Sequence, residues 1–168
     1  HIWWARRPLA ACRAVICAAL WPDPADDLCP EAFKEVARER MLDWAREHLR
    51  RASPESAVLL VAIQKDASRL DDPVTLRRAL LDFIADFANW DNSTVREYLD
   101  TSRALTQAAH EALGGVPGTR PLVVDPFAGG GSIPLEALRI GADAFASVLI
   151  PVPALRNKLF PDYMPKYG

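Results

Sequence analysis

The residue types and spacing best suited to chemistry lie between Pro121 and Ser132, in the string P-L-V-V-D-P-F-A-G-G-G-S. The β-branched run from Leu122 to Val124 is typical of a buried parallel strand. The strand ends at Asp125, and three consecutive glycines follow before the serine. Open α/β folds bind ligands at the carboxyl ends of their strands, where glycine lets a ligand approach the backbone closely. The string therefore predicts a ligand-binding turn.

The glycine spacing argues against two common nucleotide-binding loops. A phosphate-binding P-loop follows G-x-x-x-x-G-K-[ST], but no lysine comes after Gly129, Gly130 and Gly131. A dinucleotide fingerprint follows G-x-G-x-x-G, and Pro134 occupies the position of its third glycine. The pattern that remains is D-P-F-x-G-x-G-S.

That pattern resembles motif I of S-adenosylmethionine-dependent methyltransferases that modify exocyclic amines. Asp125 at the end of the strand offers an anionic acceptor to the ammonium group of the cofactor, directly or through water, and Phe127 offers an apolar wall. An ordinary glycine-rich turn without a ligand is the alternative. The resemblance implies cofactor binding by Asp125, Pro126, Phe127, Ala128, Gly129, Gly130, Gly131 and Ser132.

Longer segments resemble a family of adenine-specific DNA methyltransferases, which are large bacterial and archaeal proteins that often contain an inserted zinc ribbon. The most specific segment is D-P-F-A-G-G-G-S-I-P-L-E-A-L-R-I-G (125–141). H-I-W-W-A-R-R-P-L-A-A-C-R-A-V (1–15), F-A-N-W-D-N-S (87–93) and P-K-Y-G (165–168) support it. The resemblance implies S-adenosylmethionine as cofactor, DNA as partner of the full-length protein, and methyl transfer to an exocyclic base amine, with adenine N6 favoured.

The same resemblance gives the aromatic and basic cluster near the N-terminus a role. It implies that this element, with Trp4 and with Arg6 or Arg7 as a charged clamp, reaches the carboxylate of the cofactor. The arginines could equally contact a phosphate backbone. The alternative is that Trp3 and Trp4 pack on the core while both arginines face solvent.

The sequence departs from the family in three respects, at two positions and in one missing motif. Val148 replaces the acidic residue expected to bind the cofactor ribose, and Ile150 replaces an asparagine, while Asp143 precedes the strand and cannot easily substitute. Losing one charge-assisted hydrogen-bonded pair should weaken binding by roughly 1.5–3 kcal/mol, or about ten- to hundredfold. The chain also has no Pro-Pro pair, so it lacks the family's second motif, D/N/S-P-P-Y/F. We therefore expect an N-terminal fragment that is inactive alone, and no catalytic residue is assigned.

The elements that must position this turn suggest an α/β fold class. A mainly helical N-terminal region (1–113) and a linker (114–119) precede the start of a Rossmann-like methyltransferase domain (120–168), whose sheet is incomplete. Apolar periodicity predicts helices and strands along the chain. We expect helices at 8–20, 30–51, 73–88, 93–113 and 133–139, with Ser93 as the cap of the fourth and Gly141 ending the fifth. We expect strands at 122–124 and 144–149. The segment 57–63 could be a strand or a helix, and we favour a helix.

Composition narrows the function further. The chain has 168 residues, half of them apolar, with 20 basic and 22 acidic side chains, so a packed core is expected and charge alone indicates no partner. Three scattered cysteines predict neither a metal site nor a disulfide framework. No apolar run is long enough to span a membrane, and we expect a cytoplasmic protein.

Two other functions remain open at this stage. One is a non-catalytic remnant or helical interaction module with a degraded cofactor site. The other is an RNA amine methyltransferase, whose motif I looks similar. A partner chain or a missing C-terminal region would complete the sheet.

Overall fold

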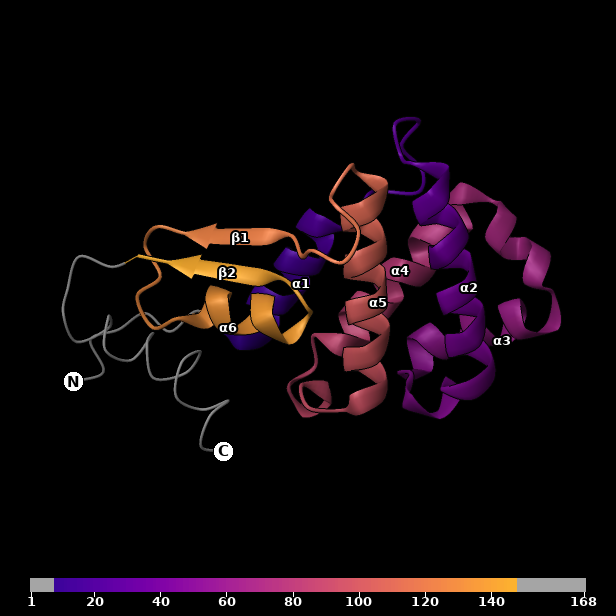
Figure 1. Ribbon diagram of the computed structural model, residues 1–168. Coiled ribbons are helices and arrows are strands. Elements are labelled where there is room, and N and C mark those ends of the chain that lie inside the picture. Colours follow the sequence, from indigo (N-terminus) through magenta and orange to yellow (C-terminus); the bar gives the residue numbers. More distant parts are fainter. Residues whose placement is uncertain (1–7, 148–168) are drawn as a thin grey trace.

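The protein combines a bundle of helices with a small parallel sheet, as the computed structural model in Figure 1 shows for the described residues 8–147. The helical part contains α1 (Leu9–Leu20), α2 (Glu31–Glu47), α3 (Pro54–Lys65), α4 (Pro73–Phe87) and α5 (Arg96–Ala112), with short 3-10 turns η1 (Leu49–Arg51), η2 (Ala67–Asp71) and η3 (Trp90–Asn92). The chain then forms β1 (Leu122–Asp125), α6 (Ser132–Arg139) and β2 (Asp143–Ala146). The predicted helical region followed by a β-α-β unit is confirmed.

Side-chain caps explain where some of the helices begin. The Ser53 hydroxyl accepts a hydrogen bond from the Ser56 backbone N–H, and Pro54 occupies the first turn of α3. The ambiguous segment 57–63 is therefore helical. The predicted cap at Ser93 is wrong: this residue closes η3, where its N–H donates to Trp90 O, and α5 begins only at Arg96.

Aromatic side chains form the centre of the helical part. The Trp44 ring lies 4.5 Å from Tyr98 and 4.9 Å from Phe83, between ring centroids, and Phe87 stacks on Tyr98. These rings come from α2, α4 and α5, so their burial joins three helices. α2 buries one face of the helix, which carries Phe33, Ala37, Met41 and Trp44.

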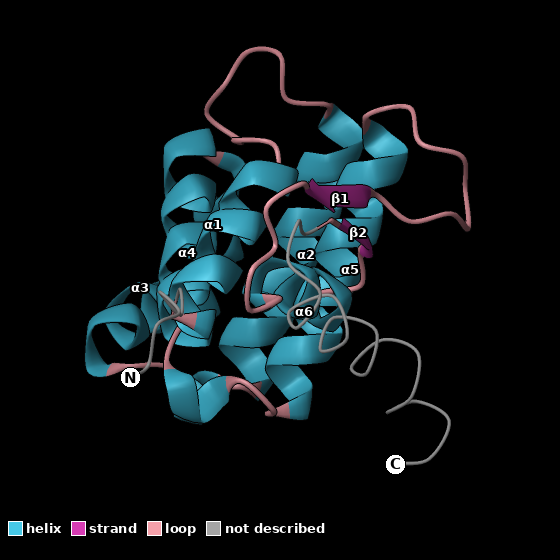
Figure 2. Cartoon of the chain, turned by 90° about the vertical axis from the view of Figure 1, so that its left-hand side faces the viewer, coloured by secondary structure: helices cyan, strands magenta, loops and turns pink. Residues whose placement is uncertain are grey.

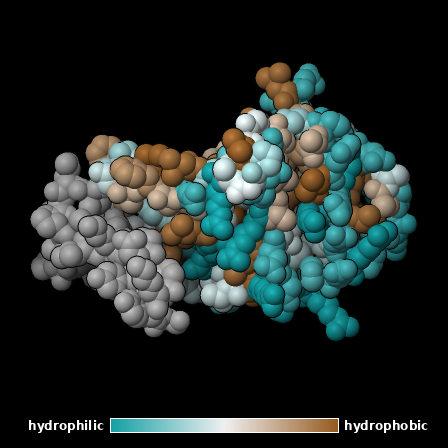
Figure 3. Space-filling view, viewed as in Figure 1, coloured by the Kyte–Doolittle hydropathy of each residue, from teal (hydrophilic) through white to brown (hydrophobic). Residues whose placement is uncertain are grey.

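The two strands are parallel, and Val124 pairs with Phe145. α6 lies against one face of the sheet, as the rotated view in Figure 2 also shows. Val123 and Ala144 point to this face and pack against the core. The other face exposes apolar side chains of both strands, because Val124 of β1 is 56% exposed and Phe145 of β2 57%. Figure 3 shows the hydrophobic surface along β1. The second strand was predicted at 144–149, and its last two residues lie outside the described part.

One hydrophobic core joins the helices to the β-α-β unit. Ile16 of α1 belongs to the same buried cluster as Ala137 and Ile140 beside it. α1 packs closely along α6, so the first helix of the chain forms part of the layer beneath the sheet.

Candidate functional site

The glycine turn joins the carboxyl end of β1 to α6. Gly129 has φ +50° and Gly131 has φ +76°, both in the left-handed region that favours glycine. Gly131 is the N-cap residue of α6, and its N–H donates to Ala128 O at 2.7 Å. The local conformation therefore needs glycine at two of the three positions, as the sequence supplies.

Backbone hydrogen bonds fix this turn to the end of β2. Ala128 N–H donates to Ser147 O at 3.1 Å, and Ser147 N–H donates to Asp125 O at 3.0 Å. The turn thus lies at the carboxyl end of both parallel strands, which is the edge where open α/β sheets bind ligands. Asp143 lies at the opposite end, because it pairs with Leu122 at the start of both strands.

The predicted site residues differ in how far they reach solvent. Asp125 is buried, and its Oδ1 accepts a hydrogen bond from Phe127 N–H at 3.1 Å. The Phe127 side chain is 79% exposed, so no described residue covers it. A methyl group built on Gly130 would meet no atom of residues 8–147 within 4 Å. The backbone at this glycine is therefore open to an approaching molecule.

This arrangement can hold a group that carries both charges. The Asp125 carboxylate favours a nearby cation, and the N-terminus of α6 carries a partial positive charge that favours an anion. An amino-acid moiety has an ammonium and a carboxylate close together and suits such a turn. Within residues 8–147, no cluster of His, Cys, Asp and Glu could hold a metal ion.

Several residues named from the sequence lie outside the described part of the chain. They are Trp3, Trp4, Arg6, Arg7, Val148 and Ile150. His48 and His110 are the histidines within residues 8–147, and each contacts a neighbouring side chain. His48 packs against the Trp44 ring, 5.0 Å between centroids, and His110 Nε2 lies 2.9 Å from Thr119 Oγ1.

A pocket of about 280 Å³ lies away from the glycine turn, beside the start of β1. Its polar groups already have partners, because Trp21 Nε1 donates to Thr106 Oγ1 at 3.1 Å and His110 contacts Thr119. The pocket therefore offers little for recognising a polar ligand. It is lined by Leu20, Thr106, His110, Leu113, Gly114, Gly115 and Pro121.

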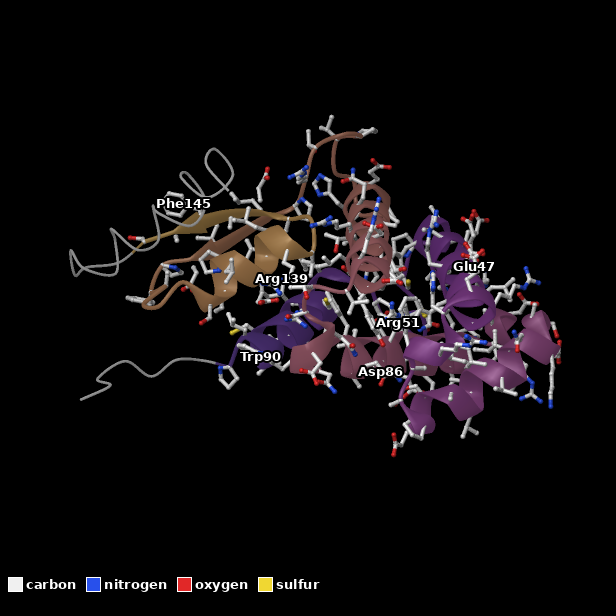
Figure 4. The ribbon with its side chains drawn as sticks, turned by 90° about the horizontal axis from the view of Figure 1, so that it is seen from below. Glu47, Arg51, Asp86, Trp90, Arg139 and Phe145 are labelled. Carbon is white, nitrogen blue, oxygen red and sulfur yellow. The ribbon has the colours of Figure 1, made fainter. Side chains whose placement is uncertain are left out.

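Sequence analysis missed a buried charge cluster behind the turn. Arg13 of α1 and Glu136 of α6 are fully buried, and Arg13 Nε lies 2.7 Å from Glu136 Oε2. Arg13 Nη1 donates to Phe87 O, and the guanidinium lies 4.6 Å from the centroid of the Phe87 ring. Arg139, labelled in Figure 4, places its Nε 3.6 Å from Glu136 Oε1, and its Nη1 donates to Ser93 O at 2.7 Å.

This cluster links segments that the sequence comparison had singled out separately. Arg13 belongs to the 1–15 string, its carbonyl partner Phe87 to the 87–93 string, and Glu136 to the 125–141 string. A signal was present in the sequence, because Arg13 lies on the same helical stripe as Leu9, Ile16 and Leu20. A charge on an apolar stripe indicates a buried partner.

No helix among residues 8–147 has the length and apolar character that crossing a membrane requires.

A comparison with known protein families gives a match for the N-terminal part of the chain. No curated protein and no solved structure matches the chain. Residues 1–49 match the family described as "Protein of unknown function (DUF1156)", a domain found at the N-terminus of some DNA methylase-like proteins.

Proposed function

We propose that this chain is the N-terminal, cofactor-binding part of a DNA methyltransferase. The full protein would transfer a methyl group from S-adenosylmethionine to an exocyclic base amine, with adenine N6 favoured, and this part alone would be inactive. The observation that carries the proposal is the buried Asp125 beside an open, left-handed glycine turn at the carboxyl end of a parallel strand. The family match over residues 1–49 supports the same assignment.

Each part of the turn has a defined task in this proposal. Asp125 accepts hydrogen bonds from the ammonium group of the cofactor, and the turn and the N-terminus of α6 face its carboxylate. Gly130 leaves space for that approach. When bound, the cofactor supplies an electrophilic methyl group. The target base would have to leave the duplex to reach it, and the residues that receive the base belong to the rest of the full protein.

The second candidate function is a non-catalytic interaction module. The open face of the sheet favours it, since Leu122, Val124 and Phe145 are each more than half exposed. Parallel sheets are ordinarily covered on both faces. A protein segment on this face would serve either a complete methyltransferase or an adaptor, so cofactor binding separates the two candidates.

Calorimetric titration with S-adenosylhomocysteine tests the proposal. We expect saturable binding to the chain, and Asp125→Asn should weaken it about ten- to hundredfold because the amide keeps the turn acceptor but lacks the charge. Gly130→Ala should also weaken binding, because the added methyl group would stand where the cofactor approaches. The fold itself should tolerate this methyl group, since no atom of residues 8–147 lies within 4 Å of it. Val58→Ala is the control, because it also changes only methyl groups and Val58 is 75% exposed on α3, away from the turn.

Two outcomes would contradict the proposal. One is a folded chain that gives no saturable heat with millimolar ligand. The other is binding that is equal in the wild type, Gly130→Ala and Asp125→Asn. Either result would favour the interaction module.

A further inference from the structure

We propose that Arg13 is a positioning residue for the glycine turn. By holding Glu136 it fixes the rotation and depth of α6, and so the turn at the N-terminus of that helix, against the helical part of the protein. The inference rests on the proposed function for its link to a ligand, but its structural content can be tested without one.

Several elements of the fold meet at the Arg13 guanidinium. Arg13 projects from α1, pairs with Glu136 of α6 at 2.7 Å, and donates to Phe87 O at the end of α4. Asn89 O, in the turn that follows, lies 3.5 Å from the same nitrogen. The planar guanidinium presents its donors in a fixed fork, so these contacts set an orientation as well as a distance.

A buried ion pair such as Arg13–Glu136 contributes little net stability by itself. Desolvating two charges offsets much of their attraction, and apolar residues of similar volume are often as stabilising. Arg13 Nη2 and Glu136 Oε1 have no hydrogen-bond partner among the described groups, which adds to that cost. The pair therefore serves to fix how α6 is oriented against α1 more than to stabilise the fold.

Only the first part of α6 separates Glu136 from the glycine turn. α6 has eight residues, and Leu135 N–H donates to Gly131 O at 3.1 Å in its first turn. The C-terminal end of the helix is also held, because Arg139 donates to Ser93 O and Arg103 Nε donates to Arg139 O at 3.1 Å. A rotation of α6 would move the glycine turn with it, and among residues 8–147 the ion-pair partners of Glu136 are Arg13 and Arg139.

The test uses a double variant that removes both charges while keeping volume, Arg13→Met with Glu136→Leu. Its fold and stability are followed by circular dichroism and urea denaturation. Native-state hydrogen exchange then reports the amides of Ala128 and Gly131, whose hydrogen bonds define the turn. The matched control is Arg96→Met, which removes a surface arginine that lies 3.3 Å from Asp100.

We expect the double variant to unfold at nearly the same urea concentration as the wild type. The two turn amides should nevertheless exchange about tenfold faster, because the turn opens locally more often. Binding of S-adenosylhomocysteine should weaken by a similar factor, and Arg96→Met should change neither quantity.

The outcomes separate this inference from the proposed function. A double variant with wild-type exchange at the turn overturns the positioning role, whatever the ligand does. Faster exchange together with a wild type that does not bind S-adenosylhomocysteine would support the positioning role and overturn the proposed function. Faster exchange with unchanged binding would overturn the link between position and affinity.

Discussion

Arg13→Met alone should destabilise the protein strongly. The substitution leaves Glu136 fully buried with its nearest cation, Arg139, 3.6 Å away. Breaking a buried pair ordinarily costs about 3–5 kcal/mol, and the remaining arginine places this case near 3 kcal/mol. Phe87 O also loses a charged donor, which adds about 1 kcal/mol.

The expected total of about 4 kcal/mol is large beside the stability of an ordinary domain, about 5–15 kcal/mol. For a chain of this length it corresponds to a fall in melting temperature of about 8–16 °C. Urea denaturation followed by far-ultraviolet circular dichroism measures the loss directly. Arg96→Met, whose side chain is mostly exposed, should change the free energy of unfolding by less than about 0.5 kcal/mol.

The effects of Arg13→Met and Glu136→Leu on the free energy of unfolding should not add. Adding Glu136→Leu to Arg13→Met should restore most of the lost stability, because no buried charge then remains without its partner. A loss below about 1 kcal/mol for Arg13→Met would refute the argument, since it would show that water reaches the pair in solution. A double variant as unstable as the sum of the two single variants would refute it as well.

Two further predictions concern titration. Burial raises the pKa of the Cys17 thiol to about 12, although the Arg13 charge opposes this shift, so a thiol reagent at neutral pH should modify Cys17 only after unfolding; rapid labelling of the native protein, read by mass spectrometry, would contradict this. Hydrogen bonds from the Thr75 hydroxyl and backbone lower the pKa of Asp72, the cap of α4, below its ordinary 3.8. The stabilising effect of the Asp72 carboxylate is therefore complete above pH 3.8 and is lost as the pH falls toward the lowered pKa. Acidification should reduce the melting temperature of the wild type more than that of Asp72→Asn, which keeps the hydrogen-bond acceptor. Equal reductions in the two proteins would count against this prediction.

Local signals account for most of the elements that the sequence predicted. Proline and serine before α3 and Gly141 after α6 act within a few residues, and the structure places helix ends beside them. Ser93 failed as a cap because a competing 3-10 turn, set by Asn89, uses that residue first. A cap signal says that a turn begins or ends, but not which of two neighbouring helices it serves.

The candidate site also has one part that the sequence predicted and one part that it did not. Asp125 and the glycines could be named from the sequence because their chemistry lies in one continuous string. The pairing of Arg13 with Glu136 could not, since 123 residues separate the two charges and nothing local indicates that α1 and α6 meet. The buried charge on an apolar helical stripe was visible, but its partner depends on the tertiary fold.

The contact between α1 and α6 also sets an order of events during synthesis. α1 leaves the ribosome early, but Glu136 follows Arg13 by 123 residues. At about 5–20 residues per second, α1 would wait roughly 6–25 s before its partner helix exists. During that interval α4 and α5 can cover part of α1, but the Arg13 charge lacks its acidic partner. A nascent chain that stalls inside the linker would therefore expose the surface that α6 later covers.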